Sequence, residues 1–277
     1  RVTRIEISGG RAVAVRTAAG DVVPVRRAVV ADVSAPALYH NLVGDENLSR
    51  FLRLRLRWFR PGAATVKVDW ALSARVPWAD ETCRGAGTVH VADSFEELSA
   101  TFRQIEDGLI PSTPFLLVGQ MTSTDPSRSP PGTESLWAYT HVPQETRGDA
   151  GGDLTGSWDD DEGARFADRM EARIERHAPG FRQRIISRHV FTPHGLEAAN
   201  ANLVGGDVMG GTAKLRQQLV LRPFPGLGRA ETPFEGLYLA SASAHPGGGV
   251  HGACGANAAK AALRTHSQVS DTRFPRV

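Results

Sequence analysis

The chain has 277 residues, of which 41% are hydrophobic and 22% charged, and its 32 basic and 30 acidic side chains nearly balance. This balance, without a basic tail, argues against a nucleic-acid partner, and no apolar run is long enough to cross a bilayer. Cys83 and Cys254, the only cysteines, lie far apart in the sequence, which argues against a disulfide framework and favours a reducing, cytoplasmic setting.

Short alternating segments, separated by glycine-containing turns, open the chain. Residues 1–7, 11–17 and 21–25 predict a three-stranded meander, because hydrophobic and polar positions alternate between the turns. Residues 28–31 then predict a buried strand.

The stretch FLRLRLRWF, residues 51–59, predicts another strand. Alternation would place Arg53, Arg55 and Arg57 on one face and the leucines on the other. Residues 65–72 have a similar pattern, so we expect the two strands to pair around a turn at Pro61 and Gly62. We favour a solvated or subunit-facing arginine face over one that contacts phosphates.

Helix and strand signals alternate after this point. Ser94, with Glu97 three residues later, predicts the N-cap of a helix that ends near Asp107. The acidic run at 159–162 predicts the start of a second helix, which ends near residue 180. The remaining expected elements are strands at 115–121, 135–142, 185–191 and 236–240 and a short helix at 193–201.

These elements together predict an α+β protein with two domains. Antiparallel pairs in the middle of the chain precede a strand-to-helix crossover at its end. The sequences at both ends of the chain are rich in valine and interrupted by glycines, as is typical of an α/β layer. We therefore expect residues 1–45 and 226–277 to form one domain, interrupted by a second domain at 46–225.

The glycine-rich sequence HPGGGVHGACGANAA, residues 245–259, is the most distinctive motif. Glycines between a strand and a helix let the backbone approach a ligand closely, and the N-terminus of a helix favours anionic groups. The alternative is a loop that only permits tight packing of helix on sheet. A zinc site at His245, His251 and Cys254 lacks a fourth ligand and paired spacing.

This motif lies within GLYLASASAHPGGGVHGACGANAA, which resembles the C-terminal flavin-binding signature of the phytoene desaturase-like FAD-dependent oxidoreductases. That family includes carotenoid desaturases, carotenoid isomerases and retinol saturases. Further stretches resemble the family in the same order: ISGGRAVAVRTAAGDVVPVRRAVVADVSAP, VDWALSARVPW, TSTDPSRSPPGTESLWAYTHVP, RIERHAPGFRQRIISRHVFTP and RPFPGLGRAETPFEGLYLA. The family's N-terminal G-x-G-x-x-G turn, which holds the FAD pyrophosphate, has no counterpart near residue 1. The resemblance therefore implies the C-terminal portion of such an enzyme: an incomplete Rossmann-type flavin domain around an antiparallel substrate domain covered by helices.

The resemblance also implies FAD as cofactor and hydride transfer between an apolar small-molecule substrate and the flavin. The cofactor-binding positions that it implies are Val2, Ala31, Asp32, Ala240, Ser241, His245, Gly247, Gly248, Gly249, Val250, His251 and Gly252. Trp137 and His141 are candidates for the lining of the substrate cavity, with ordinary strand positions as the alternative. No catalytic residue and no metal ligand is predicted.

Because half of the flavin pocket is expected to be missing, we expect this chain alone to bind FAD weakly or not at all and to be inactive. Two alternatives stay open: a family member with an unrelated small-molecule substrate, and a noncatalytic interaction or dimerisation module of the same fold. The predicted location is cytoplasmic, with peripheral membrane contact and a homodimer left open.

Overall fold

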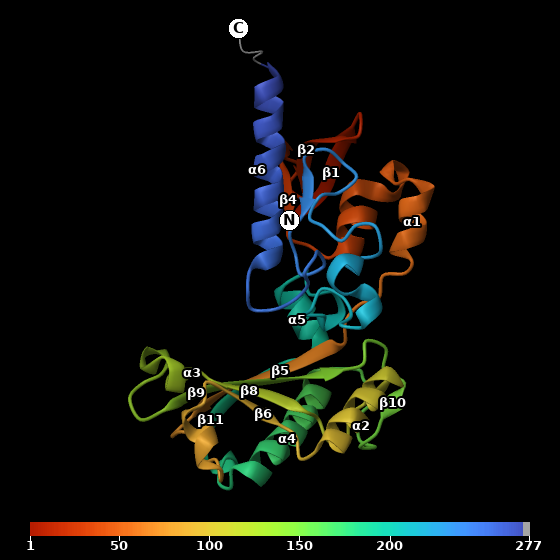
Figure 1. Cartoon of the computed structure of the whole chain (residues 1–277). Coiled ribbons are helices and arrows are strands. Elements are labelled where there is room, and N and C mark those ends of the chain that lie inside the picture. The colour runs from red at the N-terminus through yellow and green to blue at the C-terminus, as the bar shows by residue number, and fades with distance from the viewer. Residues whose placement is uncertain (274–277) are drawn as a thin grey trace. The chain divides into compact units, whose positions relative to one another are not determined.

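The structure is a computed structural model that describes residues 1–273 (Figure 1). The chain divides into two compact units, which we call unit 1 (Arg1–Gly62 and the chain from Val208 onward) and unit 2 (Ala63–Asp207). Each unit has a hydrophobic core built from its own residues.

Unit 1 contains two small sheets. The predicted meander is confirmed, with β1 (Val2–Ser8), β2 (Arg11–Thr17) and β3 (Val22–Pro24) pairing antiparallel in that order. The strand β4 (Val29–Ala31) pairs in parallel with β12 (Leu237–Leu239), so segments about 200 residues apart lie side by side.

Helix α6 (Ala253–Arg273) follows β12 and completes the strand-to-helix crossover. Its buried residues Ala258 and Ala261 pack against Tyr238 of β12 and against Ala230. The small side chains let the helix axis lie close to the strand pair, as the packing interpretation of the glycine-rich motif predicts.

Residues 51–59 do not form the predicted strand. Instead α1 (Arg50–Leu56) is a helix whose N-cap, Ser49, accepts a hydrogen bond from the backbone N–H of Leu52. Its inward side is formed by Leu52 and Leu56, and Phe59 just beyond it is also buried, a spacing of four and three residues that fits a helix. The antiparallel pairing across Pro61 and Gly62 is therefore also wrong.

Unit 2 is built on a five-stranded antiparallel sheet with strand order β11-β5-β9-β8-β6 (Figure 1). In chain order, its strands are β5 (Ala64–Leu72), β6 (Thr88–Val91), β8 (Leu116–Gln120), β9 (Glu134–Val142) and β11 (Ile185–Phe191). A separate pair, β7 (Leu109–Ile110) and β10 (Gly148–Asp149), is parallel. The predicted α+β class is confirmed, and β6 is a strand that the sequence patterns did not predict.

The main helices of unit 2 begin where they were predicted, α2 after the predicted cap and α4 within the predicted acidic run. Helix α2 (Phe95–Glu106) follows Ser94, whose hydroxyl accepts from the Glu97 N–H, and α4 (Asp160–His177) follows Asp159. The core between α4 and the sheet includes Trp70, whose indole N–H donates to Glu171 at 2.9 Å. The other face of the sheet is less deeply buried and carries the side chains discussed below.

Shorter helical segments complete the chain. They are α3 (Met121–Thr124), α5 (Pro193–Ala199), the π-helix η1 (Ala37–Gly44) and the 3-10 turns η2 (Asp45–Asn47), η3 (Glu81–Gly85), η4 (Pro126–Arg128), η5 (Arg182–Arg184), η6 (Val204–Gly206), η7 (Leu215–Gln217) and η8 (Leu219–Leu221). Within residues 1–273, no helix combines the length and apolar composition that spanning a bilayer requires.

Candidate functional site

A cavity of about 150 Å³ opens in unit 1 where β4, β12 and the start of α6 come together; we call it the glycine pocket. Its lining residues come from the chain after β4, the turn after β12 and the loop into α6: Asp32, Ala240, Ser241, Ala242, Gly247, Gly248, Gly249, His251, Gly252, Ala253, Cys254 and Gly255.

Most of the residues named from the sequence signature line this pocket. The four that do not are Val2, Ala31, His245 and Val250. Val2 begins β1 and is 40% exposed, whereas Ala31 is buried at the end of β4. Ala31 still shapes the pocket, because its carbonyl accepts a hydrogen bond from the N–H of Ala240 at 2.8 Å.

Serine side chains join the ends of the two parallel strands below the pocket. The hydroxyl of Ser241 donates to the carbonyl of Val33 at 2.6 Å and accepts from the N–H of Ser243 at 3.1 Å. The hydroxyl of Ser243 donates to the carbonyl of Gly210 at 2.7 Å. These bonds fix the turn after β12 against two other segments of unit 1.

Arg222 supports the same turn, and no role was predicted for it. Its side chain is 1% exposed. The guanidinium donates to five backbone carbonyls, those of Ala242 (2.6 Å), Met209 (2.6 Å), Thr212 (3.1 Å), Gln217 (3.2 Å) and Gly211 (3.3 Å). Its only signal in the sequence is its place in the RPFP stretch, before a proline.

The glycines around the pocket fall into two groups, one in crowded and one in open surroundings. A Cβ at Gly247 would lie 3.1 Å from Cδ of Arg222, and one at Gly248 would lie 3.1 Å from the carbonyl oxygen of Met209, so a side chain at either position would have to push its neighbour aside. At Gly252 and Gly255 an added Cβ would meet no atom within 4 Å. Because both glycines line the pocket, their side of it is open.

The start of α6 is shaped by His251 and Cys254. Nδ1 of His251 accepts a hydrogen bond from the N–H of Ala253 at 3.0 Å. The buried thiol of Cys254 lies 3.3 Å from the carbonyl of Gly247. Across the described part of the chain, no three His, Cys, Asp or Glu side chains converge as a metal site would need.

Trp137 and His141, the predicted substrate-lining residues, lie in unit 2 on β9. Together with Tyr139 they form an aromatic row on the less buried face of the sheet: the rings of Trp137 and Tyr139 stack with centroids 5.9 Å apart, and Tyr139 meets His141 edge-on at 5.6 Å. Gly119 of the neighbouring strand makes room for the indole, since a Cβ there would lie 2.1 Å from the Trp137 ring.

Charged and polar groups border the aromatic row. On β5, Lys67 is opposite Tyr139 and Asp69 is opposite Trp137, and the two form an ion pair with each other. Burial lowers the pKa of His141 and outweighs the opposing effects of the hydrogen bond with the backbone of Ala64 and of the Asp207 carboxylate, which favours the neutral ring.

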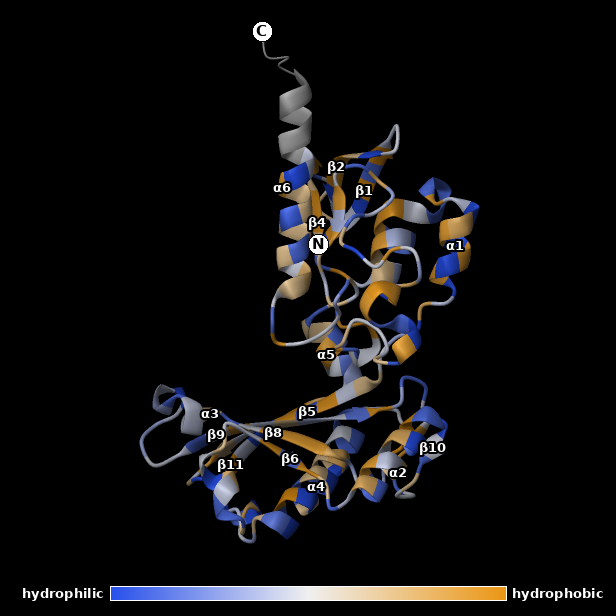
Figure 2. Cartoon of the chain, viewed as in Figure 1, coloured by the Kyte–Doolittle hydropathy of each residue, from blue (hydrophilic) through white to orange (hydrophobic). Residues whose placement is uncertain are grey.

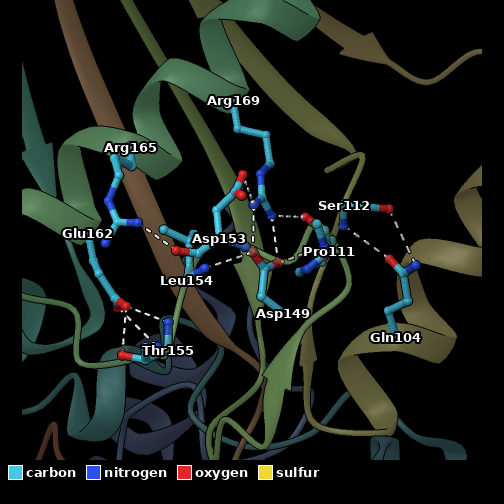
Figure 3. A network of polar contacts seen from close by, with 12 residues as sticks. Gln104, Pro111, Ser112, Asp149, Asp153, Leu154, Thr155, Glu162, Arg165 and Arg169 are labelled. Atoms are coloured by element: carbon cyan, nitrogen blue, oxygen red, sulfur yellow. Dashed lines mark hydrogen bonds and ion pairs between the residues drawn. The ribbon is translucent and has the colours of Figure 1, made fainter.

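A separate polar network in unit 2 fixes the loop between β10 and α4 (Figure 3). Asp149 receives two hydrogen bonds from Arg169, at 2.8 and 2.7 Å, and others from loop N–H groups. Glu162 accepts from the hydroxyl of Thr155 at 2.7 Å and from the N–H of Trp158 at 3.0 Å. Every acceptor in this network is matched by donors within the fold, so we assign it a structural role.

Comparison with known proteins relates the chain to a group of oxidoreductases. No protein-family model matches it. It is 35% identical over 167 residues to the mouse pyridine nucleotide-disulfide oxidoreductase domain-containing protein 2, which covers 60% of this chain and 28% of the mouse protein. It is 32% identical over 142 residues to the phytoene desaturase (lycopene-forming) of Pseudescherichia vulneris, which covers 50% of this chain and 26% of the enzyme.

A solved structure extends the likeness to the fold of nearly the whole chain. The crystal structure of an oxidoreductase from Methanosarcina mazei superimposes with a TM-score of 0.56 at 16% sequence identity, and the match covers 95% of this chain and 48% of that one. At this identity the match shows the fold alone. The resemblance inferred from the sequence motifs is confirmed: the chain is a distant homologue of phytoene desaturases and of the pyridine nucleotide-disulfide oxidoreductase domain-containing protein 2, and the matched segments span about a quarter of the length of these relatives.

Proposed function

We propose that unit 1 forms one wall of the FAD site of an oxidoreductase. We propose also that the sheet face of unit 2 that carries the aromatic row binds the substrate. One observation carries the cofactor assignment: eight residues implied by the flavin-binding signature, drawn from three separate segments, line the glycine pocket.

The chemistry of the pocket fits a flavin. Gly252 and Gly255 leave room for a flat ring, and the N-terminal end of α6, whose dipole favours negative charge, would face its electron-rich edge. When bound, the flavin would supply hydride transfer to or from a substrate carbon. The residues of this chain would bind and orient the ring, with Arg222 and Ser241 keeping the turn beneath it in place.

The volume of the glycine pocket supports weak binding by this chain alone. It is about 150 Å³, whereas cofactor sites typically have about 300 to 1,000 Å³. The pocket therefore has room for only part of an FAD molecule. We expect the purified chain to carry no stoichiometric flavin, and a flavin absorption spectrum at one equivalent would contradict this expectation.

For the substrate, the sheet face of unit 2 favours an apolar molecule that carries a polar group. The stacked rings of Trp137 and Tyr139 offer apolar area, while Lys67, Asp69 and His141 on the same face are poor partners for a plain hydrocarbon. This mixture supports the alternative of a family member whose substrate differs from a carotenoid. The other alternative, a noncatalytic interaction or dimerisation module of the same fold, would present its arginines from a helix and not from the predicted strand, because residues 50–56 are helical.

A titration with FAD, followed by amide NMR, tests the cofactor assignment. We expect the signals of residues 247–255 to shift at millimolar FAD, with smaller changes elsewhere. Gly252→Ala would place a methyl group in the pocket and weaken these shifts. Gly9→Ala is the matched control, because Gly9 has nearly the same φ (+57° against +60°) and also has open space around it. Equal shifts in both variants, or shifts confined to other residues, would rule out the glycine pocket.

A further inference from the structure

Helix α1 in unit 1 exposes an apolar strip. Phe51 and Leu54 on the helix and Trp58 in the turn after it are 61%, 54% and 69% exposed, and their spacing of three and four residues puts them on one side. The opposite side is buried in the core of unit 1 through Leu52 and Leu56. Figure 2 shows hydrophobic and hydrophilic residues mixed along this helix.

The charge around this strip is positive. The sequence has no acidic residue between Glu46 and Asp69, but it has five arginines there. Within the part of the chain that the structure describes, none of them forms an ion pair: Arg50, Arg53, Arg55, Arg57 and Arg60. Arg50 and Arg53 lie at the start of α1, where the helix dipole disfavours a cation, so their charges do not stabilise the helix that carries them.

Helix α2 in unit 2 exposes a second apolar strip, of the opposite charge. Phe95 and Phe102 are two turns apart, and therefore on the same side, and are 77% and 43% exposed. The segment 93–107 has five acidic residues and one arginine. Arg173 binds two of the acids, and the other three are exposed: Glu96, Glu106 and Asp107. Glu106 and Asp107 lie at the end of α2, where the helix dipole disfavours an anion.

We propose that α1 of one copy of this chain packs antiparallel against α2 of a second copy. The N–H of Trp58 donates to the carbonyl of Arg55 at 3.0 Å, so the turn after α1 continues the helical winding. Each strip then carries two aromatic side chains seven residues apart, and Phe51 meets Phe102 where Trp58 meets Phe95. Aromatic pairs stabilise an interface beyond the area that they bury.

The antiparallel direction also pairs opposite charges. It brings Arg50 and Arg53 at the start of α1 to Glu106 and Asp107 at the end of α2. Each of these charges is disfavoured by the dipole of its own helix, and the second copy offsets that cost by supplying the opposite charge. The charges that make each helix less stable alone therefore make the two helices complementary.

Other occupants match one strip at most. Two copies of α1 would bring their arginines together, and two copies of α2 would bring their acidic residues together. A nucleic acid would pair with the arginines of α1 but would be repelled by the acidic residues of α2. A second copy satisfies both strips at once, and this proposal does not depend on the proposed flavin site.

Sedimentation velocity of the whole chain over a range of concentrations tests the proposal. We expect the mass to rise above that of one chain at micromolar concentrations, and to rise less at high salt, which screens the charge pairs. Trp58 reports the contact, because it is the only exposed tryptophan of the five. Its fluorescence should shift to the blue as the chain associates.

Charge reversal separates this contact from other kinds of association. Arg50→Glu with Arg53→Glu should weaken self-association on the order of 100-fold, because it brings like charges together. Glu106→Arg with Asp107→Arg should do the same. Both pairs of substitutions place at the helix end the charge that its dipole favours, so we expect the fold to be retained, as circular dichroism can verify.

A mixture of the two charge-reversed variants is the decisive sample. Each variant alone should stay monomeric, whereas the mixture should associate, because α1 of each variant is again opposite in charge to α2 of the other. As controls, Arg26→Glu with Arg27→Glu and Glu81→Arg with Glu145→Arg reverse equal charges at other exposed sites and should leave association unchanged. A single-chain mass at all concentrations, a mixture that stays monomeric, or equal losses in test and control variants would overturn the proposal.

Discussion

Arg222 shows how a single buried charge holds several loops together. Its guanidinium donates to five backbone carbonyls from three parts of unit 1, and the side chain is 1% exposed. An unsatisfied buried acceptor costs about 1 to 3 kcal/mol. We expect Arg222→Leu to lower the free energy of unfolding by about 3 kcal/mol or more and to accelerate amide exchange in residues 240–249. The exposed Arg216→Leu is the control, and a similar small effect of both would contradict this role.

Asp149 makes the stability of unit 2 depend on pH. Burial opposes its ionisation, but hydrogen bonds from Arg169 and the loop amides outweigh that effect and lower the pKa of Asp149 to about 2. In an unfolded chain the pKa is about 3.9, so this stabilisation is complete above about pH 4 and lost as the pH falls towards 2.

We expect Asp149→Asn to remove about 2 kcal/mol at pH 7 and to flatten the acid dependence of the unfolding free energy. Asp153→Asn serves as the control, because Asp153 lies 3.9 Å from the same guanidinium with its side chain 75% exposed. Urea unfolding at several pH values measures both. An unchanged slope between pH 4 and 2 in Asp149→Asn would show that this carboxylate does not set the dependence.

At the scale of elements, α1 shows that alternating hydrophobic and polar residues do not by themselves establish a strand. The sequence FLRLRLRWF fits a strand with period two, yet Leu52, Leu56 and Phe59 fit a helix equally well. Leucine and arginine are good helix formers, no residue of the stretch is β-branched, and Ser49 supplies the N-cap. The N-cap residue Ser49 was therefore the feature of the sequence that could have identified the helix. The N-cap at Ser94 and the acidic start of α4, by contrast, were recognised because no competing strand pattern accompanies them.

Tight docking of α6 depends on small residues. Ala258 is fully buried against the surface that contains Tyr238. Ala258→Leu would add a branched side chain where no space exists, at a cost of about 1 to 3 kcal/mol. The neighbouring Ala259 is exposed, so Ala259→Leu adds the same atoms without this cost. Thermal unfolding compares the two variants, and equal midpoints would show that the helix does not rest on this contact.

For the whole molecule, the sequence predicts the individual helices and strands better than it predicts which of them lie next to each other in the fold. The strands and caps of unit 2 depend on local patterns, whereas the order β11-β5-β9-β8-β6 and the pairing of β4 with β12 depend on contacts between distant segments. The glycine pocket was found because its signature is nearly contiguous from Ala240 to Gly252. Arg222 was missed because only the folded loops bring the carbonyl groups to it.

The two cores predict that unit 2 folds without the rest of the chain. All buried residues of its core lie between Ala64 and Phe181, and its sheet is formed from one continuous segment. Unit 1 instead needs two distant segments, because β4 pairs with β12 and the core joins Leu38 to Phe224. We expect residues 63–207 to unfold cooperatively with well-dispersed NMR signals, and residues 1–62 to remain unfolded alone. A fragment 63–207 without a cooperative transition would show that its core requires segments of unit 1.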